Sequence, residues 1–256
     1  MEESLRICYI VPIIHIMAVK NMIGRIHSIE SMGLNDGPGV RSVIFFQGCR
    51  LRCAYCHNPD TWSINEGNEV TPEELINKIV RFKSYFNTSG GGVTCSGGEP
   101  LLQPDFLIEF FKLCKSNNIH TALDTAGFGM GRYDEILEYT DLVLLDIKHV
   151  DNEGYKDICG GAFKEVKDFI NALNKSNTDI WIRHVVVPGI TDGERHIDRL
   201  NKVISKVDNV KKVELLPYHT LGKNKYDSMN IPYRLEGVKP MCKEKIKILN
   251  KRLKVV

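Results

Sequence analysis

Three cysteines lie close together in the sequence, at a spacing that could hold a metal centre. They are Cys49, Cys53 and Cys56, in a Cys-x3-Cys-x2-Cys pattern. Cysteine thiolates are the usual ligands of iron–sulfur clusters. A [4Fe–4S] cluster held by three cysteines keeps one of its four irons open to a substrate or a cofactor. The pattern therefore favours an iron–sulfur centre that takes part in binding or reaction.

Three other interpretations of these cysteines account for less of the sequence. A structural zinc site needs four ligands in closed tetrahedral geometry, and the fourth would be His57, directly beside Cys56, or a distant residue such as Cys95. The stretch 53–57 also matches the attachment pattern of c-type haem. That interpretation leaves Cys49 unused, as does a thioredoxin-like Cys53–Cys56 pair. Structural zinc stays open as an alternative.

Two glycines and several polar residues lie at or just after the ends of short apolar runs, which is where the reactive groups of α/β folds are found. They are Gly97, Gly98, Glu99, Asp124, Asp146, Lys148 and His219, with Arg183 inside another such run. The carboxyl ends of parallel strands meet at one face of a barrel. We therefore expect these groups to share one pocket with the cysteines. By contrast, we interpret Asp36-Gly-Pro-Gly39 as a tight turn.

Six β-rich runs would position these residues. They cover 41–46, 92–96, 120–125, 142–148, 180–187 and 212–218. Several are almost entirely apolar, which is typical of strands buried on both faces of a parallel sheet. Helical patterns lie between them at 104–115, 163–175, 194–206 and 240–253, and a capping box at Thr71 begins another towards Tyr85. The alternation predicts an α/β fold.

Composition and charge exclude several classes of protein. The 256 residues carry 34 Lys and Arg against 32 Asp and Glu, a formal net charge of +2. This balance gives no strong basic field for nucleic acid or a membrane surface. A chain of this length can bury a core and does not need a disulfide framework for its eight cysteines. No signal-peptide pattern begins the sequence, so we expect a reduced, cytoplasmic protein.

The first 21 residues differ from the rest. An apolar run over 7–19 is broken by Pro12 and His15, and its thirteen residues are fewer than the roughly 20 that span a bilayer. The sequence from Met22 reads like the beginning of a domain. We therefore interpret residues 1–21 as an N-terminal extension and 22–256 as a single domain, with Met17 or Met22 as alternative start positions.

The motifs together resemble a known family. Cys-x3-Cys-x-aromatic-Cys followed by Gly-Gly-Glu resembles the radical S-adenosylmethionine (SAM) superfamily. From Met22 to near the C-terminus, stretches such as DGPGVRSVIFFQGC, SGGGVTCSGGEP, WIRHVVVPGITD and LPYHTLGKNKY are similar to the pyruvate formate-lyase activating enzymes within it. The resemblance implies a partial, open (β/α)6 TIM-like barrel with parallel strands, a [4Fe–4S] cluster and bound SAM.

The resemblance also implies roles for individual residues. Cys49, Cys53 and Cys56 would hold the cluster. SAM would contact Tyr55, Cys56, His57, Gly97, Gly98, Glu99, Asp146, Ile147, Lys148 and His219. A monovalent cation near the SAM carboxylate would be held by Asp124, Asp146 and the carbonyl of Leu144. Arg183 would position the substrate or the radical site.

The implied activity is the activation of pyruvate formate-lyase. Reductive cleavage of SAM at the cluster would give a 5′-deoxyadenosyl radical, which would remove a hydrogen atom from a backbone glycine of that partner. A flavodoxin or ferredoxin would donate the electron, and we expect a monomer. The stretch from His57 to Thr94 has no cysteine, so the extra clusters of some other activases are not expected. Two alternatives stay open: an activase of another glycyl-radical enzyme, and a non-catalytic zinc or iron–sulfur electron-carrier protein.

Overall fold

A single mixed sheet organises residues 22–254, which are the residues that the computed structural model describes; the predictions for residues 1–21 lie outside them. The strand order is β3-β1-β2-β4-β5-β6-β7-β8. The strands are β1 (Gly24–Gly33), β2 (Arg41–Phe46), β3 (Asn68–Val70), β4 (Gly92–Gly97), β5 (His120–Thr125), β6 (Leu142–Asp146), β7 (Asp179–Val186) and β8 (Val210–Pro217).

Six of these strands run parallel, from β2 to β8 in the order of the sheet. Their ends align so that Asp124 lies opposite Leu144 and Asp146 lies opposite Arg183. β1 and β3 extend the β2 edge with antiparallel pairing. Because β3 and β8 end the order and do not pair with each other, the barrel is open. The predicted partial (β/α)6 barrel is confirmed, with an antiparallel edge that we had not predicted.

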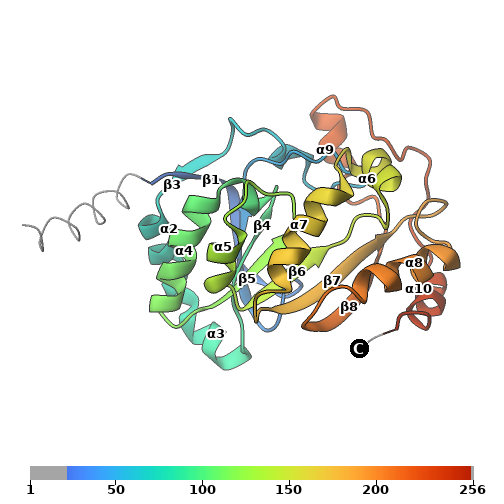
Figure 1. The fold of residues 1–256 in the computed structure, drawn as a ribbon. Helices are drawn as coiled ribbons and strands as arrows, with labels where there is room; N and C mark the ends of the chain where they lie inside the picture. The colour runs from blue at the N-terminus through green and yellow to red at the C-terminus, as the bar shows by residue number, and fades with distance from the viewer. Residues whose placement is uncertain (1–21, 255–256) are drawn as a thin grey trace, which may run out of the picture.

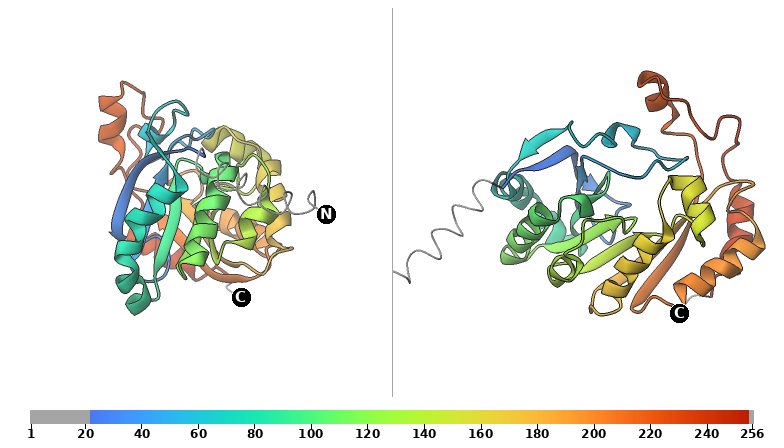
Figure 2. Two further views of the ribbon diagram at one scale, coloured as in Figure 1. Left: turned by 90° about the vertical axis from the view of Figure 1, so that its left-hand side faces the viewer. Right: turned by 45° about the horizontal axis from the view of Figure 1, so that its top comes forward.

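Helices cover the outer face of the curved sheet, where α4, α5 and α7 lie side by side (Figures 1 and 2). The α-helices are α2 (Pro72–Ile79), α3 (Lys83–Ser89), α4 (Pro104–Ser116), α5 (Tyr133–Glu138), α6 (Asn152–Cys159), α7 (Phe163–Leu173), α8 (Glu194–Ile204), α9 (Lys223–Ser228) and α10 (Lys243–Asn250). Short 3-10 turns occupy Pro59–Thr61, Val80–Phe82 and Pro100–Leu102. Within residues 22–254, none of the helices combines the length and apolar character needed to cross a membrane.

The capping box predicted at Thr71 is confirmed. The Thr71 hydroxyl accepts a hydrogen bond from the Glu74 amide at 3.2 Å, and the Glu74 carboxylate accepts one from the Thr71 amide at 2.9 Å. These two bonds satisfy amide groups that a helix start leaves without partners inside the helix. The helix does not continue to Tyr85, because a 3-10 turn separates α2 from α3.

Successive side chains along a strand point to opposite faces of the sheet, so they lie either in the core under the helices or on the concave side. Leu123, Val143 and Leu145 belong to the large core under the helices. Their neighbours in sequence point to the concave side of the sheet, where a small apolar cluster contains Ala122, Leu142 and Leu144 with Trp181 packed against it. Towards the carboxyl ends of the same strands, the concave side carries polar residues instead.

Candidate functional site

A cavity of about 470 Å³ lies at the carboxyl ends of the parallel strands and gathers nearly all the predicted site residues. Its walls include Cys49, Cys53, Tyr55, Cys56, His57, Gly97, Gly98, Glu99, Asp124, Asp146, Lys148, Arg183 and His219. Two predicted residues do not line it. The side chain of Ile147 packs in the core, and that of Leu144 lies in the small apolar cluster below the cavity.

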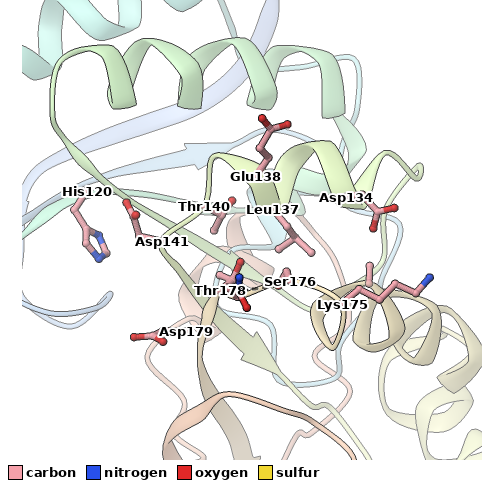
Figure 3. A pocket seen from close by; sticks show the side chains of 12 residues that line it. His120, Asp134, Leu137, Glu138, Thr140, Asp141, Lys175, Ser176, Thr178 and Asp179 are labelled. Atoms are coloured by element: carbon pink, nitrogen blue, oxygen red, sulfur yellow. Dashed lines mark hydrogen bonds between the residues drawn. The ribbon is translucent and has the colours of Figure 1, made fainter.

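A second cavity, of about 730 Å³, lies at the opposite ends of the strands (Figure 3). Its lining is polar and includes His120, Asp141 and Asp179. The carboxylate of Asp141 already accepts hydrogen bonds from Lys115 and from the Thr121 amide, the latter at 2.9 Å. Because barrel enzymes place their chemistry at the carboxyl ends of the strands, we assign these groups to stability.

The loop that contains Cys49, Cys53 and Cys56 follows β2, and we call it the cysteine loop. Hydrogen bonds fix it to the end of α6. The amide of Arg52 donates to the carbonyl of Cys159 at 2.8 Å, and the amide of Ala54 donates to that of Ile158 at 2.8 Å. Burial raises the pKa of Cys49 to about 12 and that of Cys56 to about 11. Since metal coordination deprotonates a thiol outright, these cysteines become thiolate ligands only with the charge of a metal centre beside them.

The donor set fits an iron–sulfur cluster. Three thiols from one loop line the same cavity, and thiolates are the ligands that such clusters use. Within residues 22–254, no three side chains of His, Cys, Asp or Glu converge closely enough to hold one metal ion as they stand. The fit therefore rests on the chemistry and common location of the three thiols.

A charged network crosses the floor of the cavity. Arg183 Nε donates to Asp146 Oδ1 at 2.9 Å, and its Nη2 donates to Asp124 Oδ1. Lys148 Nζ donates to Asp146 Oδ2 at 2.8 Å, and Ser96 Oγ donates to Asp124 Oδ2 at 2.6 Å. Burial alone would raise the pKa of Asp146, but Arg183 and Lys148 hold it well below its usual range. Two carboxylates and two cations balance here, and the cation site at Asp124 and Asp146 stays a prediction.

Glu99 joins the ends of two neighbouring strands. Its carboxylate accepts hydrogen bonds from Thr125 Oγ1 at 2.5 Å, the Ala126 amide at 3.0 Å and the Leu101 amide at 3.2 Å. Burial raises the pKa of Glu99 to about 7 despite these bonds. The Glu99 carboxylate thus already accepts three hydrogen bonds from the protein itself. The contact between Glu99 and SAM stays a prediction.

The two glycines before Glu99 are required by the backbone around them. Gly97 has φ +103°, a conformation that favours glycine. A Cβ atom on Gly98 would lie 2.2 Å from the carbonyl oxygen of Gly48. The end of β4 can therefore pack against the cysteine loop only without side chains at these positions.

A segment from the C-terminal part of the chain covers the cysteine loop. The ring of His219 stacks on that of His57 with centroids 4.0 Å apart. A Cβ on Gly222 would lie 2.8 Å from His57 Cα, and Tyr226 Oη donates to the Cys56 carbonyl at 3.0 Å. We call residues 219–226 the covering segment, which includes the beginning of α9.

Tyr55 has an unsatisfied group at this site. Its ring is buried, and its hydroxyl has no hydrogen-bond partner among the residues that the structure describes. Lys148 Nζ lies 5.9 Å from the centre of the ring. A buried hydroxyl without a partner is costly, so this wall of the cavity fits a bound molecule with polar groups, as SAM has.

Comparison with known proteins agrees with this geometry. Residues 43–200 match the family model described as the radical SAM superfamily. The chain belongs to the radical SAM superfamily. The matched range contains the three cysteines and every other predicted site residue except His219. Members of this superfamily use a [4Fe–4S] cluster and SAM, so these predicted cofactors are confirmed.

Individual radical SAM relatives are similar over most of their length. A protein of Clostridium pasteurianum named pyruvate formate-lyase-activating enzyme is 60% identical, covering 91% of this chain and 98% of its own. An Escherichia coli protein named pyruvate formate-lyase 1-activating enzyme is 49% identical, covering 88% and 92%. A solved domain of a pyruvate-formate lyase-activating enzyme from Bacteroides vulgatus is 25% identical, covering 64% and 93%, with a TM-score of 0.53.

An acidic residue of this radical SAM site was missed by the sequence analysis. Asp36, which we had placed in a simple tight turn, lines the cavity. Burial and the nearby charge of Asp124 raise its pKa to about 6. Its loop is held by Thr94 Oγ1, which donates to the Asp36 carbonyl at 2.6 Å, and by the buried Arg41, which donates to the Pro38 carbonyl at 3.2 Å. The signal in the sequence that could have pointed to this loop is Arg41, a charged residue at the start of the otherwise largely apolar strand β2.

Proposed function

We propose that this chain activates pyruvate formate-lyase, using SAM at a [4Fe–4S] cluster to convert a backbone glycine of that partner into a radical. The observation that carries the proposal is the single cavity in which the three cysteines meet Asp146, Lys148 and His219 at the strand ends. The names of its relatives support the choice of partner.

Each group of residues has a place in this proposal. Cys49, Cys53 and Cys56 would hold the cluster, and SAM would bind between the cysteine loop, the Gly97–Glu99 turn and the Asp146–Lys148 segment. When bound, the cluster and SAM supply reductive cleavage of a carbon–sulfur bond and removal of a hydrogen atom from glycine.

The protein's own residues prepare the site for these groups. Asp146 stays ionised beside Arg183 and Lys148 and presents a fixed acceptor to the cavity. The stacked His57 and His219 rings cover the cysteine loop and help to exclude water. Arg183 is bound to Asp124 and Asp146, so we propose that it positions these carboxylates and acts on the substrate only through them.

Glycine suits hydrogen-atom removal because its Cα carries no side chain and the resulting radical is shared with the flanking amides. The sheet does not close into a full barrel, and in this proposal a loop of the partner enters the cavity from the open side. The proposal further includes a flavodoxin or ferredoxin as electron donor, action as a monomer, and a cytoplasmic location in which the thiols stay reduced. It assigns residues 22–256 to one catalytic domain, preceded by the extension 1–21.

Anaerobic reconstitution and product analysis test this function. Wild-type protein should contain iron and sulfide, and should release 5′-deoxyadenosine from SAM in the presence of a reductant. Cys53→Ala should lose both the cluster and the product. Cys95→Ala is the matched control, because Cys95 is buried in β4 and does not line the cavity. Zinc without iron or sulfide in the wild-type protein would overturn the proposal in favour of a structural zinc protein.

A further inference from the structure

Three histidines lie in contact behind the candidate SAM site and outside the cavity. They are His149, which follows Lys148, His184 on β7 and His196 on α8. The rings of His184 and His196 stack with centroids 5.1 Å apart, and His149 meets His196 edge-on at 4.8 Å. Only 1% of His184 and 9% of His196 is exposed. Nothing in the proposed reaction accounts for this cluster.

The hydrogen bonds of the cluster fix the ring protons. His184 Nδ1 lies 2.6 Å from the carbonyl oxygen of Ile147, and His184 Nε2 lies 3.1 Å from His196 Nε2. A carbonyl only accepts hydrogen bonds, so His184 carries its proton on Nδ1. In the neutral His184 ring Nε2 then accepts, and His196 Nε2 donates. Each ring therefore holds the other in one orientation.

The carbonyl that His184 binds lies between two candidate SAM ligands. Ile147 is flanked by Asp146 and Lys148, which both line the cavity, whereas the Ile147 side chain packs in the core. The Ile147 amide donates to the carbonyl of Arg183 at 3.0 Å. His184 thus holds the other polar group of the same residue, and β7 fixes both the amide and the carbonyl of Ile147.

We propose that His184, oriented by His196, is a positioning residue for SAM binding, because it fixes the Ile147 carbonyl and with it the directions of Asp146 and Lys148. The inference rests on the proposed function of the cavity. Without the imidazole donor, the Ile147 carbonyl loses its partner beside the core and the segment turns to find another. Asp146 and Lys148 then meet SAM in altered orientations.

Two substitutions at His184 separate positioning from packing. His184→Leu fills much of the space but removes the donor. His184→Asn retains an amide N–H near the position of Nδ1. Thr140→Val is the control, because it also removes a buried side-chain donor to a backbone carbonyl, that of Ile136 at 2.8 Å, at the far end of β6.

The measurements are the Kd of SAM for the reconstituted holoenzyme, by equilibrium dialysis, and the amide hydrogen exchange of residues 146–149 without SAM. His184→Leu should weaken SAM binding about tenfold and speed exchange in this segment, while the rate at saturating SAM stays within about twofold of wild type. His184→Asn should recover most of the affinity, and Thr140→Val should bind like wild type. If His184→Leu does not fold, His196→Leu tests the same idea and should weaken binding about threefold.

Two results would overturn the inference: wild-type affinity in the leucine variants, or equal losses in His184→Leu and His184→Asn. A different result would show that the proposed function is wrong: wild-type protein with its cluster would not bind SAM at all. The positioning role of His184 would then be wrong as well.

Discussion

Individual side chains set the charge of the cavity. Asp146 receives hydrogen bonds from Arg183 and Lys148, and all three side chains are largely buried. Breaking a buried ion pair by removing one partner leaves an uncompensated charge, which costs about 3–5 kcal/mol. The network is therefore sensitive to the loss of a single carboxylate.

Asp146→Asn tests this network. We expect a marked fall in thermal stability and at least a tenfold loss of SAM affinity, because two cations lose their shared partner and SAM loses an acceptor. Asp198→Asn is the control, since Asp198 pairs with Arg252 at the surface and exposed pairs contribute little. Unchanged melting temperature and affinity in Asp146→Asn would show that the network does not support the site. Thermal melts and equilibrium dialysis provide the two readings.

At the scale of elements, the histidines between β7 and α8 link stability to pH. Burial lowers the pKa of His184 to about 4 and that of His196 to about 3. An unfolded histidine has a pKa of about 6.5, so the unfolded chain binds protons that the folded protein does not. Stability is therefore complete above about pH 6.5 and is lost as the pH falls towards the folded values.

Denaturant unfolding at pH 7.5 and pH 5 measures this linkage. His184 alone should account for about 2 kcal/mol of the stability lost between these conditions. His184→Asn lacks the titrating ring, so its free energy of unfolding should fall less than that of wild type over the same range. Equal losses in the two proteins would mean that His184 is not held neutral by the fold.

The covering segment is a second element with a defined consequence. Tyr226 Oη donates to the carbonyl of Cys56, one of the predicted cluster ligands. Tyr226→Phe removes this bond and loosens the segment over the cysteine loop. We expect the cluster to be lost several-fold faster in air than in wild type. The decay of the visible absorbance of the cluster measures this rate. Tyr233→Phe, which removes a hydroxyl bonded to Tyr218 at 2.9 Å, should lose its cluster at the wild-type rate.

For the whole molecule, much of the architecture could be predicted from the sequence because the central strands are continuous apolar runs. The predicted bounds of β2 and β5 match the structure, and the other parallel strands differ by a few residues. β1 was missed because its residues GRIHSIESMG are largely polar, as suits a strand at the partly exposed edge. β3 was missed because three residues carry too short a pattern.

The site was predictable as a set of residues, but apart from the pairing of Asp146 with Lys148, two residues apart on one strand face, its internal contacts were not. The common location of the strand ends follows from topology, which brought the cysteines and Lys148 to one cavity. The bridge from Arg183 to Asp124 and Asp146 depends on side-chain directions that spacing does not encode. The same limit hid the contact between His184 and Ile147.

An anaerobic electron paramagnetic resonance spectrum tests most directly whether this protein forms a glycyl radical on pyruvate formate-lyase. The sample holds reconstituted protein, a reductant, SAM and pyruvate formate-lyase from the same organism. We predict a glycyl-radical doublet that is absent when SAM is omitted. The absence of both a doublet and SAM cleavage, in protein verified to carry its cluster, would contradict this prediction. Accumulation of 5′-deoxyadenosine without a doublet would retain the SAM chemistry and reject pyruvate formate-lyase as the partner.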